Sequence, residues 1–171
     1  MKIFFILLAF SFSLFGTDLL KIHRKLVPMT LLQVSTVAKK SDKTIKIIIV
    51  VNKNERVKAN KLQNLFGDKI KKFSLDVKIL EEEHITKLET LDFDALYAFT
   101  LKKENYKTIN DISYKKNSVT FANTYDGFKN GLLVFIDKKK KIKIYINSTT
   151  MKIVKIPFSS KFLSIVKISD E

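Results

Sequence analysis

The sequence has no cysteine, and it has only four glycines and two prolines among its 171 residues. The absence of cysteine excludes disulfides, thiolate metal sites, iron–sulfur clusters and thiol nucleophiles. With so few glycines, the chain contains neither of the glycine-rich patterns that cradle phosphates, Gly-x-Gly-x-x-Gly and Gly-x-x-x-x-Gly-Lys. The nucleotide-binding and redox classes that depend on these patterns are therefore excluded.

Arginine is also scarce, since Arg24 and Arg56 are the only two among 32 basic residues. Against 17 acidic residues this gives a formal net charge of +15, carried almost entirely by lysine. Arginine is the usual residue for bidentate recognition of phosphates and base edges, so we expect no nucleic-acid partner. The scattered lysines favour solubility, and a weak contact with an anionic membrane surface or ligand is the functional alternative.

The N-terminus is typical of an export signal. Lys2 precedes an uncharged, mostly apolar stretch over 3–15, and Gly16 is a small residue at which cleavage is plausible. Thirteen residues are too short to span a bilayer comfortably but suit a signal-peptide core. We therefore expect a cleaved signal peptide over 1–16, a periplasmic location and a single domain over 17–171. A retained anchor and a buried core helix are the alternatives.

The body of the chain alternates between helical and strand patterns. Apolar residues at helical spacing predict a helical region over 19–38 that is either kinked at Pro28 or restarts there. The run 43–51 is β-branched and nearly continuous, which is typical of a strand covered on both faces. The remaining expected elements are a helix over 55–66 capped by Asn54 and ended by Gly67, a strand over 73–80, a short helix over 84–91, an apolar run over 93–100, a helix over 102–112 and a strand over 118–122.

The last third breaks this alternation. Two apolar segments, 131–136 and 141–146, flank a lysine-rich tip and predict an antiparallel hairpin at the edge of the sheet. Asn147 is expected to cap a segment running to residue 154, and Ser159 or Ser160 to cap a last one. The fold class is therefore α/β, with a layered, mostly parallel, Rossmann-like sheet, flanking helices and a C-terminal antiparallel hairpin.

Several motifs in this last third resemble the YfiR-like family of periplasmic proteins. They are a glycine-bearing turn, a hairpin that ends in an Ile-Asn pair, and a terminal Ser-Ser segment. In this chain the corresponding residues are Gly127, Gly131, Asn147, Ser159 and Ser160, which we take as structural motif residues. Lys155 stands where the family often has glycine. The resemblance covers about residues 20–167, but its specific motifs lie within 125–163.

The resemblance implies a homodimeric periplasmic regulator without catalysis or cofactor. Such a protein restrains an inner-membrane diguanylate cyclase, and hence cyclic-di-GMP signalling and biofilm formation, by docking on the periplasmic region of that enzyme. The family points to the hydrophobic C-terminal segment as the docking site, here Phe158, Phe162, Leu163 and Val166. The alternative for these four residues is that they close the core of the domain.

No residue pattern favours an enzyme or a metal site. His23 lies on an apolar helix face and is expected to be a packed side chain. Consecutive residues point in different directions, so the acidic run from Glu81 to His84 is expected to form the first turn of a helix rather than a metal site. Asp92 and Asp94 have no orienting partner for acid–base catalysis. The alternative function is a periplasmic module that binds an anionic ligand or membrane surface through its lysines; an export-pathway accessory is a third possibility.

Overall fold

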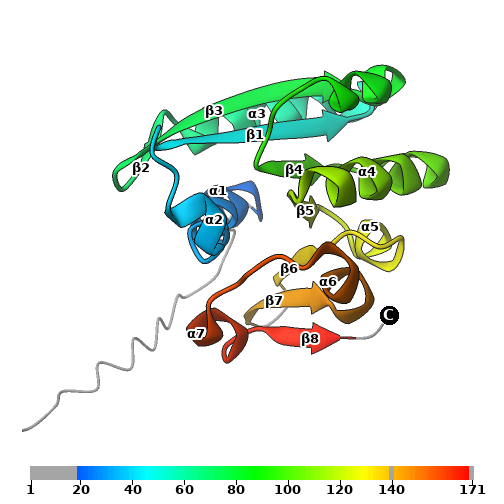
Figure 1. Ribbon diagram of the computed structural model, residues 1–171. Coiled ribbons are helices and arrows are strands. Elements are labelled where there is room, and N and C mark those ends of the chain that lie inside the picture. The colour runs from blue at the N-terminus through cyan, green and yellow to red at the C-terminus, as the bar shows by residue number, and fades with distance from the viewer. Residues whose placement is uncertain (1–18, 139–140, 170–171) are drawn as a thin grey trace, which may run out of the picture.

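The computed structural model describes residues 19–138 and 141–169 (Figure 1). The predicted signal peptide over 1–16 lies outside these residues. A single sheet of eight strands, in the order β2-β3-β1-β4-β5-β6-β7-β8, runs through the described part of the chain. Among the described residues, no helix has the length and apolar character needed to cross a bilayer. The α/β fold class predicted from the sequence is confirmed.

The centre of the sheet is parallel. Strand β1 (Thr44–Val51) pairs in parallel with β3 (Phe73–Glu81) on one side and with β4 (Ala95–Ala98) on the other. Strands β5 (Val119–Ala122) and β6 (Val134–Lys138) continue the parallel arrangement beyond β4. Helices cover both faces, so residues 47–51 of β1 are all buried, as the nearly continuous apolar run predicted.

Antiparallel pairs of strands occur toward both ends of the sheet. Strand β7 (Ile142–Asn147) pairs antiparallel with β6, which confirms the predicted hairpin. The expectation that this hairpin forms the edge was wrong, because the short strand β8 (Lys167–Ser169) pairs in parallel with β7 and covers it. At the opposite edge, β2 (Lys69–Ile70) forms a tight antiparallel hairpin with β3. Strands as short as β2 and β8 show no alternation that a sequence pattern can detect.

The N-terminal helical region is divided at a different place than expected. Helix α1 (Leu19–Leu31) contains Pro28, and the chain leaves the helix only after Leu31, before the short α2 (Ser35–Ala38). The break lies where Val34 forms an isolated antiparallel bridge with Phe158. Contacts with the C-terminal segment, rather than the proline, therefore end the helix.

The other helices agree with the sequence except at their ends. Helix α3 (Arg56–Phe66) follows a 3₁₀ turn η1 (Lys53–Glu55), which Asn52 caps in place of the expected Asn54, and Gly67 ends it at φ +66°. The predicted short helix is a 3₁₀ segment η2 (Glu82–Glu89), and α4 extends over Lys103–Lys116. Helices α6 (Ser148–Val154) and α7 (Ser160–Leu163) were expected, whereas α5 (Tyr125–Lys129) was not.

The helices divide the core into two layers, one on each face of the sheet. Alternate residues of β1 point to opposite faces, so Ile47 and Ile49 enter one layer and Ile48 and Val50 the other. The first layer also holds side chains of α1, α3 and α7, and the second holds those of η2, α4 and α5. This layering places the C-terminal segment with α7 against the larger core.

Candidate functional site

The predicted docking residues lie in and after α7, on the side of the larger core. Phe162 is buried, with 4% of its surface exposed, and its ring lies 5.3 Å from that of Phe158. Phe158, Leu163 and Val166 are partly buried and pack against the same core. All four side chains thus help to close the domain. Two other apolar side chains that follow α7 are more exposed: Ile165 is 75% exposed and Ile168 is 49% exposed.

Ser159 fixes the start of this segment to the rest of the domain. Its Oγ accepts a hydrogen bond from the backbone N of Phe162 at 3.2 Å, which caps α7, and donates to Gln33 Oε1 at 3.0 Å. The backbone N of Ser159 also donates to the carbonyl of Gln33 at 2.8 Å. Ser160, by contrast, is an exposed first residue of α7. Of the two predicted capping residues, Ser159 is therefore the one that caps α7.

Gly127 and Gly131 lie where the chain packs closely against side chains of α4. Gly131 has φ +94°, and a Cβ at this position would lie 2.6 Å from Asn110 Nδ2. That Nδ2 donates to the carbonyl of Asn130 at 2.9 Å, so the space beside Gly131 is already used. At Gly127 a Cβ would lie 3.2–3.3 Å from three buried side chains, including Tyr106. Gly131 is therefore required by its positive φ and close packing, and a side chain at Gly127 needs its neighbours to shift by a few tenths of an ångström.

Asn147 joins the hairpin to the next helix from a fully buried position. Its Oδ1 accepts from the backbone N of Thr150 at 2.9 Å, and its Nδ2 donates to the carbonyl of Phe128 at 3.3 Å. The first bond caps α6 as predicted, and the second ties that cap to α5. The motif residues thus serve the fold, and of these only Ser159 holds the C-terminal segment directly.

In open parallel sheets, ligands bind where the carboxyl ends of neighbouring strands lead helices to opposite faces. Here that position lies between β1 and β4, since α3 and α4 follow these strands and belong to different core layers. Glu55 Oε2 accepts from the backbone N of Thr100 at 3.0 Å, and Asn52 Nδ2 donates to the carbonyl of Thr100 at 2.6 Å. The side chains of Glu55 and Asn52 therefore already satisfy the backbone N–H and carbonyl groups of Thr100, with which a ligand at this edge would form hydrogen bonds.

The acidic residues Glu81, Glu82 and Glu83 beside this edge are likewise engaged by groups of the chain itself. Glu82 Oε2 accepts from the backbone N of Lys102 at 3.2 Å and from Asn105 Nδ2 at 3.0 Å. The neighbouring carboxylates turn to different cations: Glu81 lies 3.1 Å from Arg56 Nη1 and Glu83 lies 3.2 Å from Lys53 Nζ. The hydrogen bond from Lys53 lowers the pKa of Glu83. Across 19–138 and 141–169, no three acidic or histidine side chains converge as metal ligands.

His23 is a buried polar side chain that links helix α1 to strands β4 and β6. Its Nδ1 is hydrogen-bonded to the hydroxyl of Tyr97, and its Nε2 lies 3.3 Å from the carbonyl of Ile136. The Tyr97 hydroxyl donates its one hydrogen to Asn123 Oδ1 at 2.7 Å and therefore accepts from His23 Nδ1. Burial lowers the pKa of His23 to about 4, with the bond to Ile136 opposing the shift, and burial raises that of Tyr97. The expected packed histidine is confirmed.

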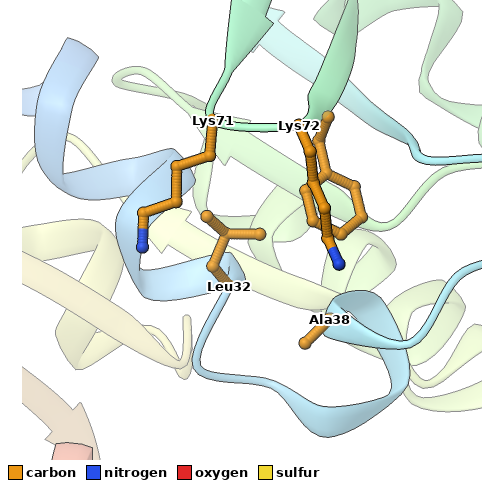
Figure 2. A pocket seen from close by; sticks show the side chains of 5 residues that line it. Leu32, Ala38, Lys71 and Lys72 are labelled. Carbon is orange, nitrogen blue, oxygen red and sulfur yellow. The ribbon is translucent and has the colours of Figure 1, made fainter.

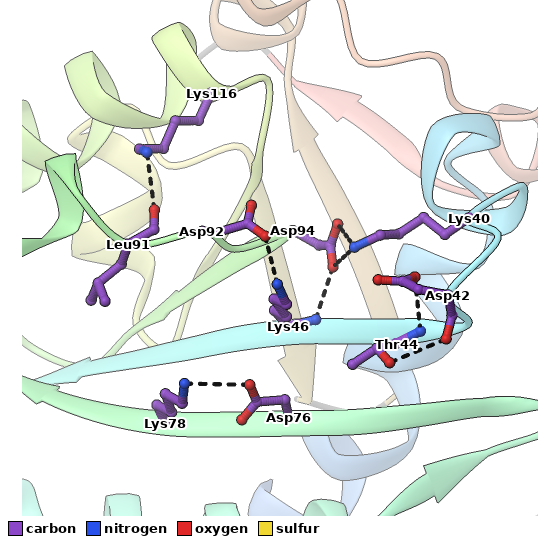
Figure 3. A network of polar contacts seen from close by, with 10 residues as sticks. All are labelled: Lys40, Asp42, Thr44, Lys46, Asp76, Lys78, Leu91, Asp92, Asp94 and Lys116. Atoms are coloured by element: carbon purple, nitrogen blue, oxygen red, sulfur yellow. Dashed lines mark hydrogen bonds and ion pairs between the residues drawn. The ribbon is translucent and has the colours of Figure 1, made fainter.

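Asp92 and Asp94 belong to a lysine network at the start of β4 (Figure 3). Asp94 accepts from Lys40 Nζ at 3.0 and 2.9 Å and from the backbone N of Lys46 at 2.8 Å. Asp92 lies 2.6 Å from Lys46 Nζ, and this hydrogen bond lowers the pKa of Asp92 and raises that of Lys46. Each carboxylate is engaged by a different lysine, so the pair ties α2 and β1 to β4.

An open hollow lies near the amino ends of β1 and β3. Figure 2 shows it between the end of α1, α2 and the β2–β3 turn, with the side chains of Lys71 and Lys72 at its sides. Its volume is about 370 Å³, and Leu32, Ala38 and Phe73 supply apolar lining. Lys72 Nζ lies 5.7 Å above the ring of Phe73. No sequence pattern pointed to this hollow.

Comparison with known proteins places the fold among α/β proteins with a mostly parallel sheet. No family model and no curated protein matches the sequence. A conserved domain protein from Vibrio cholerae is similar in structure, with 13% identity and a TM-score of 0.60 over 90% of this chain and 60% of that one.

Two further solved structures resemble the chain to a similar degree. The ABC domain in complex with L-Trp from Streptococcus pneumonia has 10% identity and a TM-score of 0.56, over 82% of this chain and 62% of that one. A substrate binding protein with adhesive properties from Clostridium difficile, in a ligand-free, open structure, has 15% identity and a TM-score of 0.57, over 84% and 59%. The chain thus spans about three fifths of the proteins it resembles.

Proposed function

We propose that this chain is a periplasmic binding protein that restrains an inner-membrane diguanylate cyclase through contact with the periplasmic region of that enzyme. The motifs that resemble the YfiR-like family support the proposal, since Asn147 caps α6, Ser159 caps α7 and Gly131 packs closely against Asn110 in this fold. The solved structures of similar fold include a substrate binding protein and a domain in complex with L-Trp, which supports a binding role.

The observation that carries the proposal is the exposure of apolar side chains directly after α7. Ile165 and Ile168 are 75% and 49% exposed, and they follow a segment whose other apolar residues are anchored in the core. Burying an isoleucine in an interface contributes about 1–3 kcal/mol. A partner that binds only the inactive enzyme needs about 1–3 kcal/mol of differential affinity to shift the population. Burial of Ile165 and Ile168 in the interface is therefore enough to supply this differential affinity.

The carboxyl edge of the sheet supports protein contact over capture of a small ligand. Glu55 and Glu82 already accept from the backbone N–H groups of Thr100 and Lys102. A ligand at this edge has to displace these bonds and desolvate two carboxylates.

In this proposal the protein performs no chemical step. It binds as a homodimer, and an equilibrium sedimentation experiment on the exported protein tests that state.

The proposal is tested by removing the exposed side chains without disturbing the core. The double variant Ile165→Ser, Ile168→Ser is expected to abolish restraint, so cellular cyclic-di-GMP rises to the level of a deletion strain. Val57 is 79% exposed on α3, far from the C-terminal segment in the fold, and Val57→Ser is the matched control that retains restraint. Phe162 is unsuitable for this test because a polar residue at its buried position disrupts the core. Equal cyclic-di-GMP in the double variant and the control contradicts the proposal.

A further inference from the structure

Three aromatic rings form a continuous row on one face of the C-terminal part of the sheet. The Tyr125 and Phe135 ring centroids are 5.8 Å apart, and those of Phe135 and Tyr145 are 6.2 Å apart. The buried Phe128 lies beside all three, at 6.1, 6.0 and 6.4 Å. Tyr125 is 52% exposed, and Phe135 and Tyr145 are half-buried. The row therefore leaves aromatic surface open to solvent between α5 and β7.

Exposed lysines border the row. Lys129 Nζ lies 5.6 Å from the centre of the Tyr125 ring, and Lys167 Nζ lies 6.0 Å from that of Tyr145. Lys143 is two residues from Tyr145 in β7, so both side chains point to the same face. All three lysines are exposed. We call the three rings with Lys129, Lys143 and Lys167 the aromatic–lysine face.

The charge around this face has a single dominant sign. The described residues 129–138 and 141–169 contain eight lysines and one acidic residue, Asp137, which pairs in register with Lys143. Asp126 is the other nearby acid, next to Tyr125. Two copies of such a face repel each other, so self-association does not cover it. Charge complementarity requires an anionic partner.

The arrangement of the rings fits a lipid surface better than a nucleic acid. Tyr125 stacks on Phe128 at 26° and Phe135 on Tyr145 at 30°, and lysines lie over the two tyrosine rings. Ring faces that are already covered do not offer the platform on which bases stack. Tyrosine and lysine instead combine an apolar body with a polar end, which suits the boundary between headgroups and acyl chains.

We propose that the aromatic–lysine face binds the surface of an anionic phospholipid bilayer. The lysines attract the headgroup phosphates, and the ring edges of Tyr125 and Tyr145 enter the headgroup region. This contact is peripheral and needs no membrane-spanning segment. It uses other side chains than the proposed docking on a cyclase: Lys167 precedes Ile168 in β8, but successive side chains of a strand point to opposite faces.

The experiment measures co-sedimentation of the full chain with vesicles. Vesicles of phosphatidylcholine with about 30% phosphatidylglycerol are compared with vesicles of phosphatidylcholine alone, at moderate salt. We expect binding to the anionic vesicles only. Each lysine near an anionic surface contributes a factor of about five, so Lys129→Gln, Lys143→Gln, Lys167→Gln together lower the partition coefficient about 100-fold. Tyr125→Ser alone lowers it about tenfold through lost apolar burial.

A charge-matched triple variant separates this face from a general effect of the basic chain. Lys69, Lys71 and Lys72 lie at the opposite edge of the sheet and are exposed, so changing all three to Gln removes the same charge. This control is expected to keep the partition coefficient within about threefold of the unaltered chain. Equal losses in the two triple variants, equal binding to neutral vesicles, or binding of a single-stranded oligonucleotide in preference to anionic vesicles each overturn the proposal. No measurement involves a cyclase, so its failure leaves the proposed function standing.

Discussion

His23 makes the stability of this fold depend on pH between about 4 and 6.5. The pKa of His23 falls from 6.5 to about 4 because the side chain is buried. Between these values the unfolded chain holds a proton that the folded chain lacks. The free energy of unfolding therefore rises with pH through this window and is lost as the pH falls. With these two pKa values the loss between pH 7 and pH 5 is about 2 kcal/mol.

The assay is urea unfolding at pH 7 and at pH 5. The variant His23→Gln retains polar groups toward Tyr97 and Ile136 but does not titrate, so its pH-dependent loss is expected to shrink to a few tenths of a kcal/mol. His84, the only other histidine, is exposed, and His84→Gln is the matched control that keeps the full loss because His23 is intact. If His23→Gln and the unaltered chain lose the same free energy, the buried, neutral histidine is not the cause and the reasoning fails.

Two further predictions concern backbone positions with positive φ. Lys155 ends α6 at φ +51°, where a side chain is strained, so Lys155→Gly is expected to raise the free energy of unfolding by about 0.5–1 kcal/mol in thermal unfolding. Lys152→Gly, inside the same helix, is expected to lower it by about 1 kcal/mol, and a loss of stability in both variants refutes the strain at Lys155. Gly131→Ala is expected to cost about 2–4 kcal/mol, because its Cβ would lie 2.6 Å from Asn110 Nδ2. Gly67 has open space around it, but its φ of +66° and ψ of −169° form a backbone conformation that only glycine adopts readily, so Gly67→Ala is expected to cost about 1–3 kcal/mol. A cost at Gly131 no greater than that at Gly67 contradicts the role given to the crowding.

Local patterns in the sequence predicted the centre of the fold. The apolar run of β1 and the alternation in β7 each identify a strand, and the side chains of Asn147 and Ser159 form the caps expected of them. These features depend on neighbours within a few residues. The sequence therefore carries them without any knowledge of the tertiary structure.

The features that the sequence missed depend on contacts between distant segments. The end of α1 is set by the bridge from Val34 to Phe158, and β8 exists because the chain turns back beside β7. The bonds of Glu55 with Thr100 and of His23 with Tyr97 likewise join separate elements.

The same limit applies to the predicted docking residues. Helical spacing marked Phe162 as apolar but did not distinguish its buried position from the exposed one of Ile165. A residue pattern indicates which face of an element is apolar, and only the packed structure shows whether the domain itself covers that face.

The central claim is that apolar side chains at the C-terminus bind a protein partner, and the affinity for the periplasmic region of the cyclase tests it most directly. The measurement is isothermal titration at about 50 mM and about 500 mM salt. An apolar contact through Ile165 and Ile168 predicts a dissociation constant that changes by less than about threefold between the two salt concentrations. Absence of binding, or a loss of a hundredfold or more as the salt rises, contradicts the account.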